Sequence, residues 1–339
     1  MKGVLLVNLG SPDSTSTKDV RKYLDEFLMD ERVIDVPYWL RAILVKGIIL
    51  NTRPRKSAKA YKKIWWDEGS PLIVLSERLL AKVQKKTDIP VALAMRYGNP
   101  SIKSGLQELD DQGVTDVLVV PLYPQFAMAT TETITVLADQ LQKDHFPKMK
   151  LKHLPAFYNK KEYIKVLGDS IKNYLVDKDW DKLMFSYHGV PERHIRKSDV
   201  TKSHCNPSDQ TFACCRAKES AAHEFCYKHQ CYETTRQVVE YLDLKPEQYF
   251  TTFQSRLGSD PWLQPYTDKT IEKFAEEGVE KLAVVTPAFV SDCLETLEEI
   301  GMEGKEEFIE AGGKEFYAVP CINDNDDWVE VLVNWIEEN

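Results

Sequence analysis

The sequence predicts an α/β protein of two similar doubly wound (Rossmann-like) halves, each with a parallel four-stranded sheet, facing a central cleft. Three observations lead to this prediction. Continuous apolar runs such as 4–8 and 182–188 end at glycine- and proline-containing loops, which is typical of strands buried on both faces. These runs alternate with amphipathic helical segments. Residues 113–120 and 278–285 align without a gap, which indicates an internal duplication.

Length and composition set the class of protein. The 339 residues suffice for two domains, which we place at 1–165 and 166–339. Hydrophobic residues make up 43% and charged residues 29%, as in soluble globular proteins. The net charge of −9 argues against a nucleic-acid partner, because phosphate binding requires a basic surface. No run reaches the roughly 18 apolar residues of a membrane span. The first residues lead directly into a strand pattern, so we expect a cytoplasmic protein.

In the first half, apolar runs and helical patterns alternate in the order of a βαβ fold. The first run ends at Gly10 and Pro12, as a buried strand ends at a loop, and an amphipathic helix follows. After Pro90 come a strand, a turn at 96–100, a helix that ends at Gly113, and another strand. The predicted elements are strand 4–8, helix 17–29, strand 91–95, helix 101–112 and strand 117–122.

The second half repeats this order, with a turn at 256–261 and a helix that ends at Gly278. Neither opening strand is followed by Gly-x-Gly-x-x-Gly, and the chain lacks Gly-x-x-x-x-Gly-Lys-Ser/Thr. The sequence therefore predicts neither a dinucleotide site nor a P-loop nucleotide site. The predicted elements are strand 182–188, strand 249–253, helix 270–277, strand 282–285 and a C-terminal helix.

One segment of the first half, residues 37–66, is unusually apolar at its start and is called the lip below. Between Pro37 and Leu50 its only charged residues are Arg41 and Lys46, and basic, tryptophan-rich sequence follows. Such a helix can lie in a membrane interface, which predicts a peripheral contact with the inner face of the plasma membrane. The alternative is a core helix beside a solvated basic face.

The strand over 182–188 ends at a histidine. Gly189 and Pro191 follow His188 at once and prevent regular structure from continuing. In open parallel sheets, ligands bind beyond the carboxyl ends of the strands. A histidine there can bind a metal or transfer a proton near neutral pH. The alternative is a histidine that merely caps the strand.

A strand-end segment near residues 287–299 carries an acidic row. If it is helical from about Ser291, then Asp292, Glu295 and Glu299 lie on one face at i, i+3 and i+7. Neighbouring carboxylates raise each other's pKa values and suit a path for cations or protons. The alternative is an acidic first turn favoured by the helix dipole. Together with aromatic residues in other strand-end loops, the row predicts a pocket for a flat apolar ligand with metal or proton chemistry.

The chain resembles the ferrochelatases, enzymes that insert ferrous iron into a porphyrin at the end of haem biosynthesis. The resemblance extends over essentially the whole chain, and its strength lies in several motifs that occur in one order. These motifs are residues 5–12, 69–72, 123–126, 185–191 (FSYHGVP), 254–258, 261–263 and 289–297.

The resemblance implies a lyase that makes haem from ferrous iron and a porphyrin with loss of two protons. His188 would be the active-site histidine and Glu295 its partner carboxylate, and both would face the substrate iron. Asp292 and Glu299 would lie on the path of protons or metal. Many family members carry a second histidine where this chain has Cys293, which puts in doubt schemes that require that histidine.

The resemblance also implies the porphyrin contacts. Leu9, Tyr61, Phe126 and Trp262 would wall the macrocycle, and Arg53 and Ser70 would meet its propionates. The sequence does not distinguish protoporphyrin IX from coproporphyrin, although the apolar lip favours the less polar ring. The alternatives are a two-lobed protein that carries a tetrapyrrole or metal without chemistry, or a chelatase for another metal or porphyrin.

Five of the seven cysteines lie in one insertion at about 196–231, with three histidines interleaved. In a cytoplasmic protein such crowding indicates metal before disulfide. Some microbial ferrochelatases carry a [2Fe–2S] cluster on cysteines, and the insertion resembles such a site, with four thiolates as ligands. Structural zinc and free or redox thiols are the alternatives. The candidate ligands are Cys205, Cys214, Cys215, Cys226 and Cys231.

Overall fold

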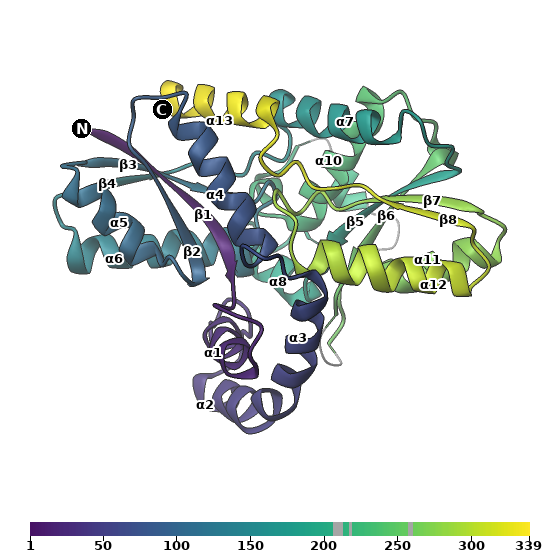
Figure 1. Ribbon diagram of the computed structural model, residues 1–339, viewed down its shortest axis with the longest axis horizontal. Helices are drawn as coiled ribbons and strands as arrows, with labels where there is room; N and C mark the ends of the chain where they lie inside the picture. The colour runs from purple at the N-terminus through teal and green to yellow at the C-terminus, as the bar shows by residue number, and fades with distance from the viewer. Residues whose placement is uncertain (206–212, 217–218, 257–259) are drawn as a thin grey trace. The chain divides into compact units, whose positions relative to one another are not determined.

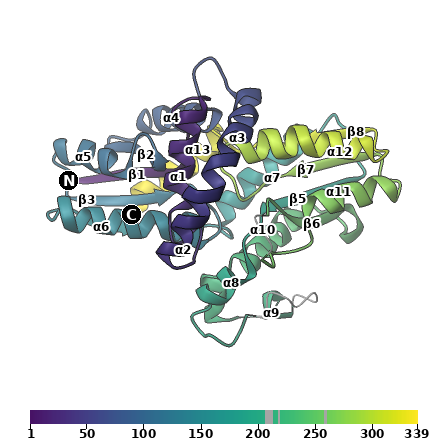
Figure 2. The same ribbon diagram turned by 90° about the horizontal axis from the view of Figure 1, so that it is seen from below.

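The computed structural model describes residues 1–205, 213–216, 219–256 and 260–339. The chain divides into two compact units. Unit 1 comprises residues 1–123, 128–155 and 323–339, and unit 2 comprises residues 124–127 and 156–322. Each unit has a parallel four-stranded sheet with flanking helices, which confirms the predicted fold class (Figures 1 and 2). Half of the predicted turn at 256–261 and parts of the cysteine-rich insertion lie outside the described residues.

The sheet of unit 1 has the strand order β2-β1-β3-β4. Its central strand β1 is buried on both faces, which is why its sequence is continuously apolar. β1 and β2 run about three residues beyond the prediction, since Gly10 pairs with Tyr97. A Cβ atom at Gly10 would lie 1.8 Å from the Tyr97 carbonyl oxygen, so only glycine permits this pairing. The strands are β1 (Lys2–Ser11), β2 (Val91–Gly98), β3 (Asp116–Pro121) and β4 (Lys150–His153).

Helices cover both faces of this sheet. Leu5 and Val7 of β1 pack against α5 (Ile102–Asp111) and α6 (Thr133–His145), and η2 (Met128–Glu132) leads into α6. The opposite face contacts α4 (Pro71–Gln84), on which α13 (Asp326–Glu338) packs. The ammonium group of Lys82 in α4 forms ion pairs with Asp324 and Asp326, which hold the segment that leads into α13 against α4. The predicted boundary after residue 165 placed α13 in the second half, whereas in the structure α13 belongs to unit 1.

The lip forms one continuous helical stretch next to α1 (Thr17–Leu28). It comprises α2 (Tyr38–Ala42), the π-helical η1 (Ile43–Ile49) and α3 (Leu50–Ile64). Tyr38, Trp39, Ile43 and Ile48 are each more than half exposed, so this face of α2 and η1 is not part of a core.

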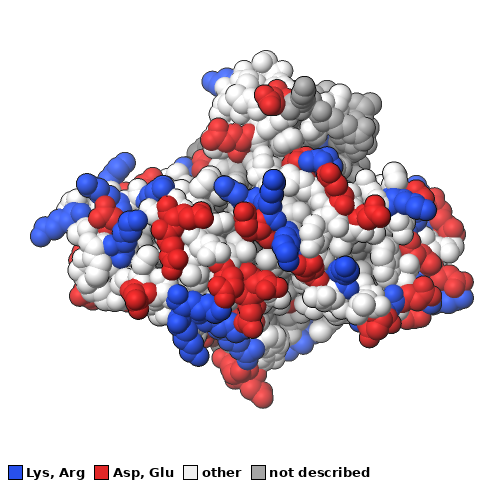
Figure 3. Space-filling model, turned by 90° about the horizontal axis from the view of Figure 1, so that it is seen from above, with Lys and Arg blue, Asp and Glu red and all other residues white. Residues whose placement is uncertain are grey.

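Charged side chains of both signs adjoin each other over the face drawn in Figure 3.

The sheet of unit 2 has the order β6-β5-β7-β8, the same relative order as in unit 1. Met184 packs with α11 (Thr267–Glu276), η5 (Glu295–Gly304) and α12 (Lys305–Glu310) on one face. On the other face lie α7 and α10, where the hydroxyls of Tyr187 and Thr235 are 2.9 Å apart. The remaining bounds are β5 (Lys182–His188), β6 (Tyr249–Gln254), β7 (Lys281–Val285), β8 (Glu315–Ala318), α7 (Lys161–Leu175), α8 (Glu192–Ser198), α9 (Ala213–Arg216), η3 (Ala221–Glu224), α10 (Tyr227–Tyr241) and η4 (Pro246–Gln248).

The two halves repeat each other in detail at the ends of α5 and α11. Gly113 and Gly278 follow these helices with φ of 75° and 91°. The next amides, of Val114 and Val279, donate to carbonyls five residues back, over 3.0 Å and 2.9 Å. Both turns are the glycine-dependent helix ending of the Schellman type. This shared turn supports the predicted duplication.

Candidate active site

His188 is the last residue of β5, as predicted, and the strand's period of two determines where its side chain points. Met184 and Ser186 lie on the face covered by α11 and η5, and His188 continues that row. The hydroxyl of Tyr227 donates to the His188 carbonyl oxygen over 2.8 Å and fixes the strand end. The ring of His188 lies 6.3 Å from that of Phe289.

A hydrogen bond defines the tautomer of His188. Its Nδ1 atom lies 2.6 Å from the carbonyl oxygen of Gly189, and a carbonyl can only accept. In the neutral ring Nδ1 therefore carries the proton, and Nε2 keeps its lone pair. The side chain is only partly buried, so this lone pair can act as a base or as a metal ligand.

The loop that carries Trp262 packs against the loop after His188. Trp262 pairs with Pro191 in an antiparallel bridge, and the Leu263 amide donates to the Val190 carbonyl oxygen over 3.1 Å. A Cβ atom at Gly189 would lie 3.3 Å from the Trp262 ring and 2.9 Å from the Gln254 carbonyl oxygen. Glycine is required here because the two loops approach so closely.

The acidic segment differs from the predicted arrangement. Helical turns begin only at Leu294, and η5 is π-helical from Glu295, so Asp292 precedes the helix and the predicted i, i+3, i+7 face is wrong. The side chain of Asp292 is buried and accepts hydrogen bonds from Thr296 Oγ1 at 2.9 Å and the Cys321 amide at 3.3 Å. These bonds stop a regular helix from starting at Ser291.

Glu295 and Glu299 remain together in η5. Burial, and to a smaller extent the carboxylate of Glu295, together raise the pKa of Glu299 to about 7, against a hydrogen bond from Ser255 that lowers it. Ser255 Oγ donates to Glu299, and Gln254 Nε2 donates to the Glu295 carbonyl oxygen over 3.2 Å. Sequence reasoning included Gln254 and Ser255 in a motif but gave them no role. The sequence places both residues directly after the predicted strand 249–253, but it does not show that Gln254 pairs with His188.

Phe126 also belongs to unit 2. Its amide donates to the Gln230 side chain over 2.7 Å, and its ring meets Phe225 edge to face at 5.1 Å. Trp262, described above, lies in unit 2 as well, and the remaining predicted porphyrin residues belong to unit 1. Leu9 is partly buried at the end of β1, and Ser70 is buried directly before α4. In α3, Tyr61 is buried and stacks edge to face on Trp65, whereas Arg53 is exposed.

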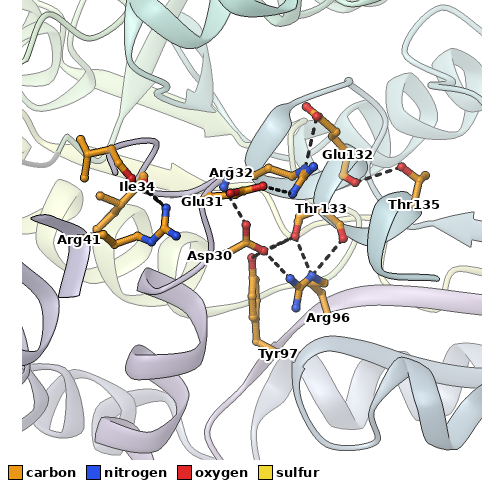
Figure 4. Close-up of polar contacts among 11 residues, drawn as sticks. Asp30, Glu31, Arg32, Ile34, Arg41, Arg96, Tyr97, Glu132, Thr133 and Thr135 are labelled. Atoms are coloured by element: carbon orange, nitrogen blue, oxygen red, sulfur yellow. Dashed lines mark hydrogen bonds and ion pairs between the residues drawn. The ribbon is translucent and has the colours of Figure 1, made fainter. Parts of the chain in front are cut away.

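A buried polar network of unit 1 fixes the loop that leads into the lip (Figure 4). The carboxylate of Asp30 accepts hydrogen bonds from Arg96, Thr133 and, over 3.0 Å, the Tyr97 hydroxyl. Burial alone would raise the pKa of Asp30, but these hydrogen bonds and the charge of Arg96 hold it below its usual value. Arg41 donates to the carbonyl oxygens of Ile34 and Val36, which fixes the other end of the loop.

All seven cysteines are free thiols. In the insertion, the Sγ atoms of Cys205 and Cys226 are 3.9 Å apart, which is contact without a bond. Hydrogen bonding with Cys226 raises the pKa of Cys205, and the nearby thiols of Cys214 and Cys215 add to this. In the part of the chain that the structure describes, no three His, Cys, Asp or Glu side chains form a set that could hold a metal ion.

Three histidines surround the short helix α9 of the insertion. The Cys214 carbonyl oxygen lies 3.2 Å from His204 Nε2 and 3.1 Å from His223 Nε2. His229 Nδ1 lies 2.8 Å from the Cys215 carbonyl oxygen, and its ring stacks on that of His223 at 3.6 Å. These contacts hold the backbone of both cysteines. Thiols are the type of ligand that a thiolate-bound metal requires, and the sulfur atoms of Cys205 and Cys226 are already in contact.

Among the described residues, none of the helices has both the length and the apolar composition needed to cross a membrane.

Known proteins resemble this chain over nearly its full length. The ferrochelatase family model matches residues 1–339. A ferrochelatase of Stutzerimonas stutzeri (strain A1501) is 49% identical over 333 residues, which cover 98% of this chain and 96% of the relative. A ferrochelatase of Pseudomonas fluorescens (strain SBW25) is 47% identical, with 97% of this chain and 95% of the relative covered.

A solved structure shares the fold at low sequence identity. SirB from Bacillus subtilis with Fe3+ has a TM-score of 0.55 and 11% identity, covering 99% of this chain and 94% of that one. This likeness supports the fold alone. The family match and the identity to curated relatives together show that the chain belongs to the ferrochelatase family.

Proposed function

We propose that His188 and Glu295 remove the pyrrole protons when this ferrochelatase inserts ferrous iron into a porphyrin to form haem. The observation that carries the proposal is the hydrogen bond from His188 Nδ1 to the Gly189 carbonyl oxygen. It leaves Nε2 as a base at the carboxyl end of a central strand, where ligands bind in this class of fold.

The reaction exchanges two pyrrole protons for one divalent cation, so a base must stand against the ring. A neutral imidazole can accept such a proton near neutral pH. Glu295 supplies a second acceptor, and Glu299, with its pKa raised to about 7, can take up and release a proton at the working pH. Asp292 has a supporting role in this scheme, because its hydrogen bonds hold Thr296 and Cys321 at the start of η5.

The porphyrin contacts are carried over from the family's motifs. Phe126, Trp262, Leu9 and Tyr61 are the proposed walls of the macrocycle, and Arg53 and Ser70 are the proposed contacts of its propionates. The exposed apolar residues of the lip favour protoporphyrin IX as the substrate and a peripheral contact with a membrane surface, because Trp39, Ile43 and Ile48 offer apolar area to lipid.

For the insertion we propose a [2Fe–2S] cluster, with structural zinc as the alternative. Cys205 and Cys226 are the first candidate ligands because their sulfur atoms are in contact, and Cys214, Cys215 and Cys231 supply the others. When bound, the cluster would supply redox-active iron and add its binding free energy to folding. The histidines beside α9 orient the backbone of Cys214 and Cys215 for either metal.

The test is iron-dependent loss of porphyrin fluorescence with turnover. His188→Ala should lower kcat by about 10²- to 10⁴-fold, the usual contribution of a general base, while porphyrin binding stays near normal. Glu295→Gln should lower kcat far more than porphyrin affinity. Glu306→Gln, an exposed change in α12, is the control. More than about a tenth of normal turnover in His188→Ala would reject its role as base. Absence of turnover in the unaltered protein would favour a carrier.

A further inference from the structure

Two consecutive residues at the end of β6 contact two acidic residues of η5, Glu295 and Glu299. The side-chain amide of Gln254 donates to the backbone carbonyl oxygen of Glu295 over 3.2 Å. The hydroxyl of Ser255 donates to the carboxylate of Glu299. Both contacts lie within unit 2. The pair therefore touches η5 at its first residue and one turn later.

An unusual backbone conformation makes this possible. Successive side chains of a strand point to opposite faces, so Gln254 and Ser255 would not reach the same helix in a regular strand. Ser255 has φ of +58°, in the left-handed region that residues other than glycine rarely adopt. This turn ends the alternation directly after Gln254. Strained residues of this kind persist where surrounding contacts hold them, and they cluster at functional sites.

Gln254 also holds the loop that follows His188. It lies opposite His188 in the β5–β6 ladder, and its carbonyl oxygen accepts from the Gly189 amide over 2.6 Å. Gly189 is in turn the acceptor that fixes the tautomer of His188. One residue thus bonds the backbone beside His188 and the backbone of Glu295.

The side-chain orientation of Gln254 is determined by its partners. The Glu295 carbonyl can only accept, so the amide nitrogen of Gln254 must face it. The amide oxygen then faces Ser186, whose hydroxyl donates to it over 2.7 Å. Thr267 Oγ1 lies 2.8 Å from Ser186 Oγ, and all three side chains are buried. The glutamine is therefore held at both ends of its amide group.

We propose that Gln254 and Ser255 are positioning residues for proton transfer, with Gln254 setting the separation of His188 and Glu295 and Ser255 orienting Glu299. The inference rests on the roles proposed above for His188, Glu295 and Glu299. Proton transfer requires donor and acceptor within hydrogen-bond reach. A displacement of about 1 Å can lower a rate by about 100-fold, so loss of either contact should act on the chemical step.

The first test compares two replacements of Gln254. Gln254→Met keeps the length of the side chain and removes both polar groups, and Gln254→Glu keeps an acceptor for Ser186 but removes the donor to Glu295. Both should lower kcat by about 10- to 100-fold, with the porphyrin KM changed less than about two-fold. The control is Gln84→Met in unit 1, where the glutamine also bonds backbone, accepting from the Val91 amide over 2.8 Å. This control should keep normal kcat.

The second test uses Ser255. Ser255→Ala removes the donor to Glu299 and should lower kcat several-fold without a change in porphyrin KM. Ser255→Asn should restore part of the rate, because asparagine tolerates the left-handed region and carries a donor. Ser255→Gly is the matched control, because glycine also tolerates the left-handed region but carries no side-chain donor. A merely structural serine would be rescued by glycine as well as by asparagine.

Three outcomes would overturn the inference. They are normal kcat in both Gln254 variants, a raised porphyrin KM with unchanged kcat, or a loss of activity that only follows the loss of folded protein on thermal unfolding. His188→Ala is assayed in parallel. If that variant keeps its turnover, the proposed function fails. If it is inactive while the Gln254 variants are normal, only the positioning role fails.

Discussion

The carboxylates of Glu295 and Glu299 lie close enough in η5 for the charge of Glu295 to raise the pKa of Glu299. The larger cause of that shift is burial of Glu299, and the hydrogen bond from Ser255 opposes it. A carboxyl group with a pKa of about 7 is half ionised near neutral pH. Such a carboxyl group can take up and release a proton near neutral pH, as the proposed proton path requires.

The raised pKa of Glu299 predicts a pH-dependent stability. The pKa is about 7 in the folded protein against an ordinary value of 4.5 for a glutamate, so the native state binds the proton more tightly than the unfolded state. The stabilisation is complete below the lower value and is lost as pH rises through the higher one. Glu299→Gln removes this loss. Between about pH 5 and pH 8, the free energy of unfolding of the variant should therefore rise by up to about 3 kcal/mol relative to that of the unaltered protein.

Urea unfolding at several pH values measures this difference, with the exposed Glu306→Gln as the control. Parallel pH profiles for Glu299→Gln and the unaltered protein would show that Glu299 ionises normally.

The Asp30 network predicts a large loss of stability from a small change. Asp30→Asn keeps the shape of the side chain but leaves the guanidinium of Arg96 without its carboxylate, and both side chains are mostly buried. Breaking a buried pair from one side costs about 3–5 kcal/mol. We expect a loss of about 3 kcal/mol in urea unfolding. Glu68→Gln breaks the exposed pair with Arg78 and should cost less than about 1 kcal/mol. Equal effects in the two variants would contradict the buried network.

The sequence predicted the positions of six strands and the duplication, because buried parallel strands and glycine-ended helices leave local signals. It did not locate β4 and β8, which are mostly exposed or only partly buried and so have no continuous apolar run. It also predicted that His188 ends a strand. It did not predict that β1 continues through Gly10, since glycine usually marks the end of a strand and here permits a close approach to Tyr97. It placed Asp292 in a helix because spacing alone does not show the hydrogen bonds that hold its side chain.

The roles inferred for Gln254 and Ser255 could not be predicted for a related reason. They depend on a left-handed φ at Ser255 and on contacts between residues about 40 positions apart. Neither leaves a mark in the local pattern of polar and apolar residues. The contact between Cys205 and Cys226 depends in the same way on how the insertion folds.

The exposed apolar residues of the lip predict membrane binding. Replacing Trp39, Ile43 and Ile48 by serine should weaken cosedimentation with lipid vesicles by at least about ten-fold, since each buried apolar side chain contributes about 1.5–3 kcal/mol. Turnover of porphyrin in detergent should be retained. Val176→Ser is the control, because Val176 is 78% exposed but lies outside the lip. Equal sedimentation of all variants would reject the proposed membrane contact of the lip.

The cysteine insertion predicts a spectroscopic signature. Protein purified without oxygen should absorb in the visible range and contain iron and acid-labile sulfide. Cys226→Ser or Cys231→Ser should bleach this absorption and lower stability, because ligation contributes folding free energy. Activity should fall only with the folded fraction.

Cys293 provides the matched control for this experiment. It is buried near Glu295, outside the insertion, and Cys293→Ser should keep the absorption. Colourless protein without iron or sulfide would reject the cluster, and stoichiometric zinc would establish the alternative.

The position of α13 affects the order in which the chain can fold. Residues 323–339 belong to unit 1, but they are synthesised after the whole of unit 2. On the ribosome, the face of α4 that later meets α13 stays uncovered while about half of the protein emerges. The ion pairs of Lys82 likewise cannot form until Asp324 and Asp326 have been synthesised. Unit 1 thus reaches its final state only after residues 323–339 have been synthesised, and the surface of α4 that they cover is exposed until then.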